Sequence, residues 1–122
     1  MKTTEENNQL IAEFMGVKPN KDGEYEMYQA LDFIEDGEDE KHFYFGKEME
    51  FKTSWNWIMP VVEKIDQIGA SVIIGRMFCE IKYIDPLNQS KHFEVRIASG
   101  VKINAINGAI VDFIQWYNEN KS

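Results

Sequence analysis

The sequence is poor in cysteine and proline, and it lacks any apolar run long enough to cross a membrane. Its single cysteine, Cys79, excludes an intramolecular disulfide framework and a zinc site built on several thiolates. The amino terminus has no apolar stretch of the signal-peptide kind, which favours a cytoplasmic location. The 122 residues fit one domain over residues 1–122, long enough to bury about two-thirds of the surface of the unfolded chain.

Basic residues are scarce as well. The chain has 13 Lys and Arg against 21 Asp and Glu, a formal net charge of −8. Residues 24–50 alone carry −8, with ten acids against Lys41 and Lys47, whereas residues 1–23 carry −1 and residues 51–122 carry +1. Such a segment repels phosphate backbones and anionic membrane surfaces and attracts basic partners. We therefore expect neither nucleic-acid nor membrane binding. The ordinary alternative is a solvated acidic loop that keeps the protein soluble.

Apolar periodicity predicts a helix near each end of the chain. The first follows a capping box at Thr3–Glu6 and ends at Gly16. The last contains Gly108, whose missing side chain allows close packing. Its apolar stripe is formed by Ile103, Ile106, Ile110, Phe113, Ile114 and Tyr117.

A third helix is predicted in the middle of the chain. Thr53 or Ser54 caps its start, and Gly69 provides a C-terminal turn. Pro60 lies inside it and lacks an N–H donor, so we expect the first turn to be separate or kinked.

Alternating side chains predict strands in two regions. Around Tyr25–Met27 and over residues 42–45 the pattern is short, and the acidic tract 35–40 is expected to be loop. From Ser71 to Ile97 the pattern predicts a three-stranded β-meander. One register of its last two strands brings opposite charges together on the outer face, and its pairs are Tyr83 with Phe93, Ile81 with Val95, Cys79 with Ile97, Lys82 with Glu94 and Glu80 with Arg96. The fold class is thus α+β: an antiparallel sheet of three to five strands packed with three helices in an α/β/α sandwich-like arrangement.

Three tracts resemble a known group of proteins: residues 8–16 (NQLIAEFMG), 53–65 (TSWNWIMPVVEKI) and 109–120 (AIVDFIQWYNEN). The chain resembles small uncharacterised proteins of gut bacteria and of their phages and prophages, related to the phage ABA-sandwich domain. The resemblance implies a sheet layered between helices and a mobile-element origin. It supplies no catalytic residues.

A Cys–His nucleophile is the first chemistry to consider, since Cys79 and His92 lie on paired strands. The predicted register sends Cys79 inward and His92 outward, so the two cannot share a proton. We expect Cys79 to be a buried small hydrophobe and both histidines to be ordinary surface residues.

Calcium binding is the second chemistry to consider, because two loops combine acidic residues with glycine. With Gly37 at position 6 of an EF-hand loop, Ile34 stands at position 3 and Phe43 at position 12. With Gly23 there, Lys18 stands at position 1. Neither loop fits, so we expect no metal site and no cofactor, and only weak cation binding without fixed geometry stays open.

The sequence favours a non-enzymatic accessory or interaction protein that meets a basic partner through residues 24–50, for example as a nucleic-acid mimic. Trp55 and Trp116 lie at the edges of apolar stripes and would be exposed anchors. The candidate binding residues are Asp32, Glu35, Asp36, Glu38, Asp39, Glu40, Trp55 and Trp116. Two alternatives remain: a small hydrolase using paired carboxylates, and a structural homo-oligomer assembled through aromatics.

Overall fold

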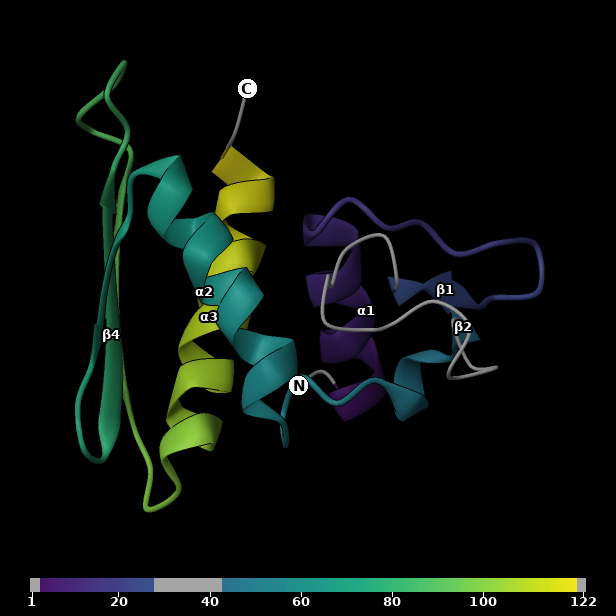
Figure 1. Cartoon of the computed structure of the whole chain (residues 1–122). Helices are drawn as coiled ribbons and strands as arrows, with labels where there is room; N and C mark the ends of the chain where they lie inside the picture. The colour runs from purple at the N-terminus through teal and green to yellow at the C-terminus, as the bar shows by residue number, and fades with distance from the viewer. Residues whose placement is uncertain (1–2, 28–42, 121–122) are drawn as a thin grey trace. The chain divides into compact units, whose positions relative to one another are not determined.

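The computed structural model describes residues 3–27 and 43–120 and divides into two compact units, Met1–Pro60 and Val61–Ser122 (Figure 1). In chain order the described elements are α1 (Thr4–Phe14), β1 (Tyr25–Glu26), β2 (Phe43–Tyr44), the 3-10 helix η2 (Gly46–Glu48), α2 (Trp55–Ile68), β3 (Ser71–Ile74), β4 (Phe78–Ile84), β5 (His92–Ala98) and α3 (Lys102–Asn120). These helices and antiparallel sheets confirm the predicted α+β class. No helix in the described ranges is long and apolar enough to cross a membrane. The single domain stays a prediction.

α1 begins and ends as its sequence predicts. Thr3 Oγ1 accepts a hydrogen bond from the Glu6 N–H at 3.1 Å, and Glu6 Oε1 accepts one from the Thr3 N–H at 2.9 Å, which completes the capping box. At the other end Gly16 has a φ of +91°, a conformation that glycine adopts without steric cost. The Val17 N–H donates to the Ala12 carbonyl, so α1 closes with a Schellman turn.

The buried amide of Asn8 joins α1 to η2. Its Nδ2 donates to the carbonyls of Gly46 and Met49, at 2.8 and 2.9 Å, and the side chain is 1% exposed. Gly46 lies directly against α1, because a Cβ added there would come 2.8 Å from Cγ of Glu5. One amide and one missing side chain therefore hold the 3-10 helix against α1.

The residues that flank the centre of the acidic segment form a small antiparallel pair. Tyr25 pairs with Tyr44 and Glu26 pairs with Phe43, which confirms the two short predicted strands. Tyr25 and Tyr44 are buried, and Trp57 packs edge-on against Tyr44 with ring centroids 5.1 Å apart. The pair thus has one face in the core of the first unit. The predicted loop at 35–40 lies outside the described residues.

α2 is one unbroken helix. The carbonyl of Ser54, the residue before it, accepts hydrogen bonds from the N–H groups of Trp57 and Ile58. At the other end Gly69 has a φ of +113°, and the helix closes at the predicted residue. Because the helix continues through Pro60, the expectation of a separate first turn is wrong. Proline removes only one donor there, and the preceding turn is already bonded to Ser54.

The second unit contains a three-stranded antiparallel sheet in the order β3–β4–β5. The register of β4 and β5 is confirmed in every predicted pair, namely Tyr83 with Phe93, Ile81 with Val95, Cys79 with Ile97, Lys82 with Glu94 and Glu80 with Arg96. The apolar members of these pairs therefore share one face of the sheet, and the charged members share the other.

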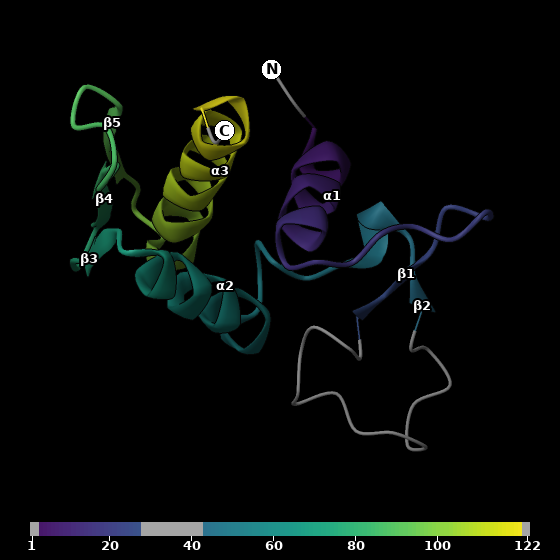
Figure 2. The same cartoon turned by 90° about the horizontal axis from the view of Figure 1, so that it is seen from above.

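Both helices of the second unit lie on one face of this sheet. α3 packs against β4 and β5, and the part of α2 in this unit lies on the same side (Figure 1, Figure 2). The missing side chain of Gly108 allows the close approach predicted for it, since a Cβ there would come 3.3 Å from Cγ2 of Ile97. The opposite face presents exposed Lys82, Glu94 and Arg96 to solvent. Within this unit the described helices lie on one face of the sheet, whereas a sandwich would have helices on both. The other face carries exposed Ile73 and Ile84 beside its charged side chains.

The substitution Asn8→Asp tests the link between α1 and η2. An aspartate has no N–H to give to the Gly46 and Met49 carbonyls, and it places a negative charge beside them. We expect a loss of about 2–3 kcal/mol in the free energy of unfolding, measured by urea denaturation. Asn88→Asp is the matched control, because the exposed Asn88 accepts hydrogen bonds from the Ser90 N–H and hydroxyl groups through Oδ1, which aspartate keeps. Equal stabilities of the two variants would contradict this account.

Candidate functional site

Six of the eight predicted binding residues lie outside the described part of the chain: Asp32, Glu35, Asp36, Glu38, Asp39 and Glu40. His42, which was predicted to be a surface residue, lies outside it as well. The structure describes what flanks them. Glu26 ends β1 and stands opposite Phe43, which begins β2. The two ends of the intervening acid-rich segment are therefore held side by side by a strand pair, at a spacing of about 5 Å between paired Cα atoms.

Two exposed aromatic side chains accompany the acids at this position. Phe43 is 44% exposed and Phe45 is 41% exposed, while Tyr44 between them is buried. The Phe45 N–H donates to Oε1 of Glu48 at 2.7 Å, so this aromatic and this acid are neighbours. We call Glu26, Phe43, Phe45 and Glu48 the acid–aromatic surface. The two phenylalanines were missed as binding residues, although alternation along the strand would have placed them outward.

Trp55 is the first residue of α2 and is 44% exposed, as expected for the edge of the helix stripe. It belongs to the first unit, like the acid–aromatic surface. Trp57, two residues later, faces inward and is 4% exposed. Of the two tryptophans on this short stretch, Trp55 alone can serve as a surface anchor.

Trp116 belongs to the second unit and is half-buried in an aromatic cluster. Its ring centroid lies 5.5 Å from that of Phe93 and 5.9 Å from that of Tyr83. Phe113 and Tyr117, one helical turn apart on α3, stack with centroids 5.6 Å apart. The cluster joins the carboxyl-terminal half of α3 to the β4–β5 hairpin, so Trp116 has a structural role in addition to its exposed edge.

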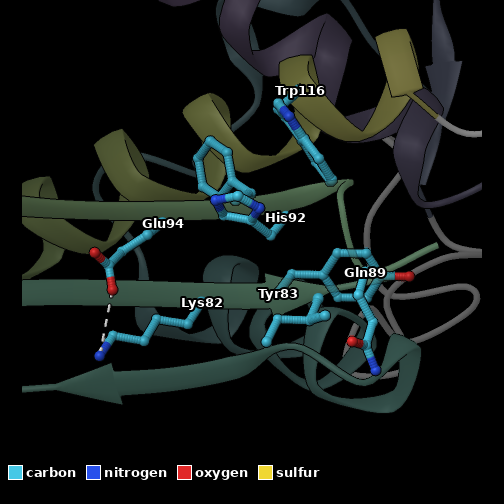
Figure 3. Close-up of a pocket in the computed structure, with 8 residues that line it drawn as sticks. Lys82, Tyr83, Gln89, His92, Glu94 and Trp116 are labelled. Carbon is cyan, nitrogen blue, oxygen red and sulfur yellow. Dashed lines mark ion pairs between the residues drawn. The ribbon is translucent and has the colours of Figure 1, made fainter. Parts of the chain in front are cut away.

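A groove of about 730 Å³ lies beside this cluster (Figure 3). Its walls combine aromatic and polar side chains, and it is lined by Lys82, Tyr83, Ile84, Gln89, His92, Phe93, Glu94 and Trp116. Lys82 Nζ and Glu94 Oε2 form an ion pair at 3.3 Å across the two strands, as the register predicts. Among the described residues that line the groove, Glu94 is the one carboxylate, so they do not provide the paired carboxylates that the hydrolase alternative needs.

Cys79 has the buried position predicted for it. Its side chain is 0% exposed, and burial raises the pKa of the thiol to about 11. His92 is exposed near the other end of the hairpin, on the charged face of the sheet. The two residues therefore cannot form a nucleophilic pair. Among the described residues, no three His, Cys, Asp or Glu side chains come together in a way that could hold a metal ion.

Comparisons with protein-family models, with curated proteins and with solved structures find no significant match to this chain.

The Cys79 thiol is expected to resist alkylation in the folded protein. A pKa of about 11, above the ordinary value of 9.0, keeps it protonated at neutral pH, and burial excludes the reagent. Iodoacetamide labelling followed by mass spectrometry should give a negligible rate at pH 8 and complete labelling in urea. Since the thiolate is disfavoured only in the folded state, stability should fall as the pH rises above 9. Fast labelling of the native protein would show that Cys79 is accessible.

Proposed function

We propose that this protein is a non-enzymatic interaction protein whose acidic segment, residues 24–50, binds a basic protein partner. The partition of charge carries the proposal. Residues 1–60 hold the full net charge of −8, whereas residues 61–122 hold seven acids and seven bases. A basic partner is therefore attracted to the first unit and not to the second.

The local geometry gives this attraction a defined anchor. The β1–β2 pair fixes both ends of the acid-rich segment on the first unit, so the segment stays attached at two points. Exposed Phe43 and Phe45 accompany Glu26 and Glu48 there. Arginine side chains can pair with carboxylates and also stack on aromatic rings, which makes an arginine-rich surface the partner that this chemistry fits best.

A nucleic-acid mimic is the specific form of the proposal. A run of carboxylates resembles the charge of a phosphate backbone, and a DNA-binding enzyme offers a basic groove to receive it. The proposal includes a cytoplasmic location, where such enzymes work, and a mobile-element origin. The acids and the exposed aromatics would be the binding residues, and the partner rather than this chain would carry the chemistry.

Neutralising three acids tests the proposal. We expect the variant with Asp36→Asn, Glu38→Gln and Asp39→Asn to lose most of its capture of basic DNA-binding proteins from a bacterial lysate at low salt. The matched control neutralises the exposed acids Glu63, Asp66 and Glu119 of the second unit, which changes the net charge by the same amount. Quantitative mass spectrometry of the captured proteins gives the measurement.

Two further comparisons sharpen the test. Capture by the wild-type chain should weaken steeply with added salt and should compete with duplex DNA, since both would occupy one basic groove. Equal losses in the two triple variants would mean that only the net charge matters. Capture that is independent of salt, or no capture of basic proteins, would refute the proposal.

A further inference from the structure

β5 forms the long outer edge of the β3–β4–β5 sheet. β5 pairs with β4 over seven residues, and in the described part of the chain no strand pairs with its other side. The opposite edge, β3, is only four residues long. An open edge strand is a template for a further strand, and proteins usually protect it with proline, inward charges, lysine or a bulge. Residues 92–98 contain no proline and no lysine, and their register with β4 is continuous.

The hydrogen bonds of the hairpin show which residues face this open edge. The Asp85 N–H donates to the Lys91 carbonyl, and the Ser99 N–H donates to the Met77 carbonyl, both at 2.9 Å. In antiparallel strands the hydrogen-bonded pairs alternate, so the odd-numbered residues of β5 exchange their hydrogen bonds with β4. The N–H and C=O groups of the even-numbered residues point away from β4. These residues are His92, Glu94, Arg96 and Ala98.

The side chains of β5 are self-complementary about Val95. An antiparallel copy of β5 with Val95 opposite Val95 places Glu94 opposite Arg96 twice, once on each side of the twofold axis. The same register places Phe93 opposite Ile97 on the apolar face and keeps all seven residues paired. A shift of two residues in either direction brings Glu94 opposite Glu94 or Arg96 opposite Arg96, and like charges disfavour both shifts.

We propose that two copies of this chain pair through β5 in that register and form one continuous six-stranded sheet. The even-numbered residues, whose backbone groups face the open edge, form the hydrogen-bonded pairs of the new ladder. The charges allow it, because residues 61–122 have no net charge. The helices allow it as well: α3 packs over β4 and β5, so two strand spacings separate it from its copy, about 10 Å, which is an ordinary helix-packing distance.

The two charged side chains are available for this pairing. The Glu94 side chain is 61% exposed and keeps a free side beyond its contact with Lys82. Arg96 is exposed and lies over the ring of Phe78, 4.1 Å from the ring centroid. In the described residues its guanidinium makes no ion pair within 4 Å, so Glu94 of a second copy is a suitable partner.

Light scattering coupled to size exclusion tests the dimer over a concentration series. We expect a mass that rises from the 14.3 kDa of the chain to twice that value. Arg96→Glu places glutamates opposite each other at both pairs and should raise the dissociation constant about tenfold or more. Arg96→Gln should have a smaller effect. Circular dichroism verifies that each variant is folded. A wild-type chain that stays at 14.3 kDa up to its solubility limit would overturn the proposal.

Disulfide trapping tests the register independently of the charge variants. Val95 is the one β5 residue that faces its own copy, in a pair without hydrogen bonds where side chains are closest. Val95→Cys should therefore give a covalent dimer under mild oxidation, reversible by dithiothreitol. Ile97→Cys is the matched control, since both residues lie half-buried on the same face of the strand, yet Ile97 would face Phe93. Both cysteines are introduced into a Cys79→Ala background, because Cys79 pairs with Ile97 across the hairpin and would otherwise form an intramolecular disulfide with the thiol introduced there. A dimer that traps through Ile97 and not through Val95 would overturn this register, whatever the charge variants do.

Discussion

The pairing of β4 with β5 is the constraint on which the second unit depends. It sets Cys79, Ile81 and Tyr83 on one face and Glu80 and Lys82 on the other, and a slip of one residue would exchange the two sets. The apolar face then receives α3, with Gly108 close to Ile97, and the aromatic cluster at the end of the hairpin follows from the same choice. The register also decides which backbone groups of β5 point away from β4. The pairing of β4 with β5 thus determines both which side chains enter the core and which backbone groups of β5 are available at the edge of the sheet.

The two units differ in net charge and in the kind of interaction proposed for each. The first unit carries the surplus of negative charge, and its small core and the amide of Asn8 hold the strands from which the acidic segment leaves and to which it returns. The second unit has no net charge and an ordinary sheet-and-helix core. The proposed attraction of a basic partner therefore lies in the first unit, and the proposed pairing with a second copy through β5 lies in the second unit. Binding of a basic partner and association through β5 would use residues of different units.

Much of the fold could be predicted because its signals are local. The capping box at Thr3, the glycines at 16 and 69 and the strict alternation along β4 and β5 each act over a few residues. Pro60 shows the limit of this reasoning, since a single proline predicts a break that the surrounding turn overrides. The layering of the second unit is another limit. The described helices of that unit lie on one face of its sheet, whereas the family resemblance implies helices on both faces.

The residue types of the candidate site could be predicted from the sequence, but the contacts that position its side chains could not. The sequence by itself determined the charge partition, the burial of Cys79 and the register of the hairpin, because these depend on residue types and on their spacing. Tertiary structure decided that Asn8 is buried against the carbonyls of Gly46 and Met49, and that β1 and β2 bring the ends of the acidic segment together. It also decided that Phe43 and Phe45 are exposed beside Glu26 and Glu48. These features depend on contacts between residues far apart in the chain, which no local pattern of side chains specifies.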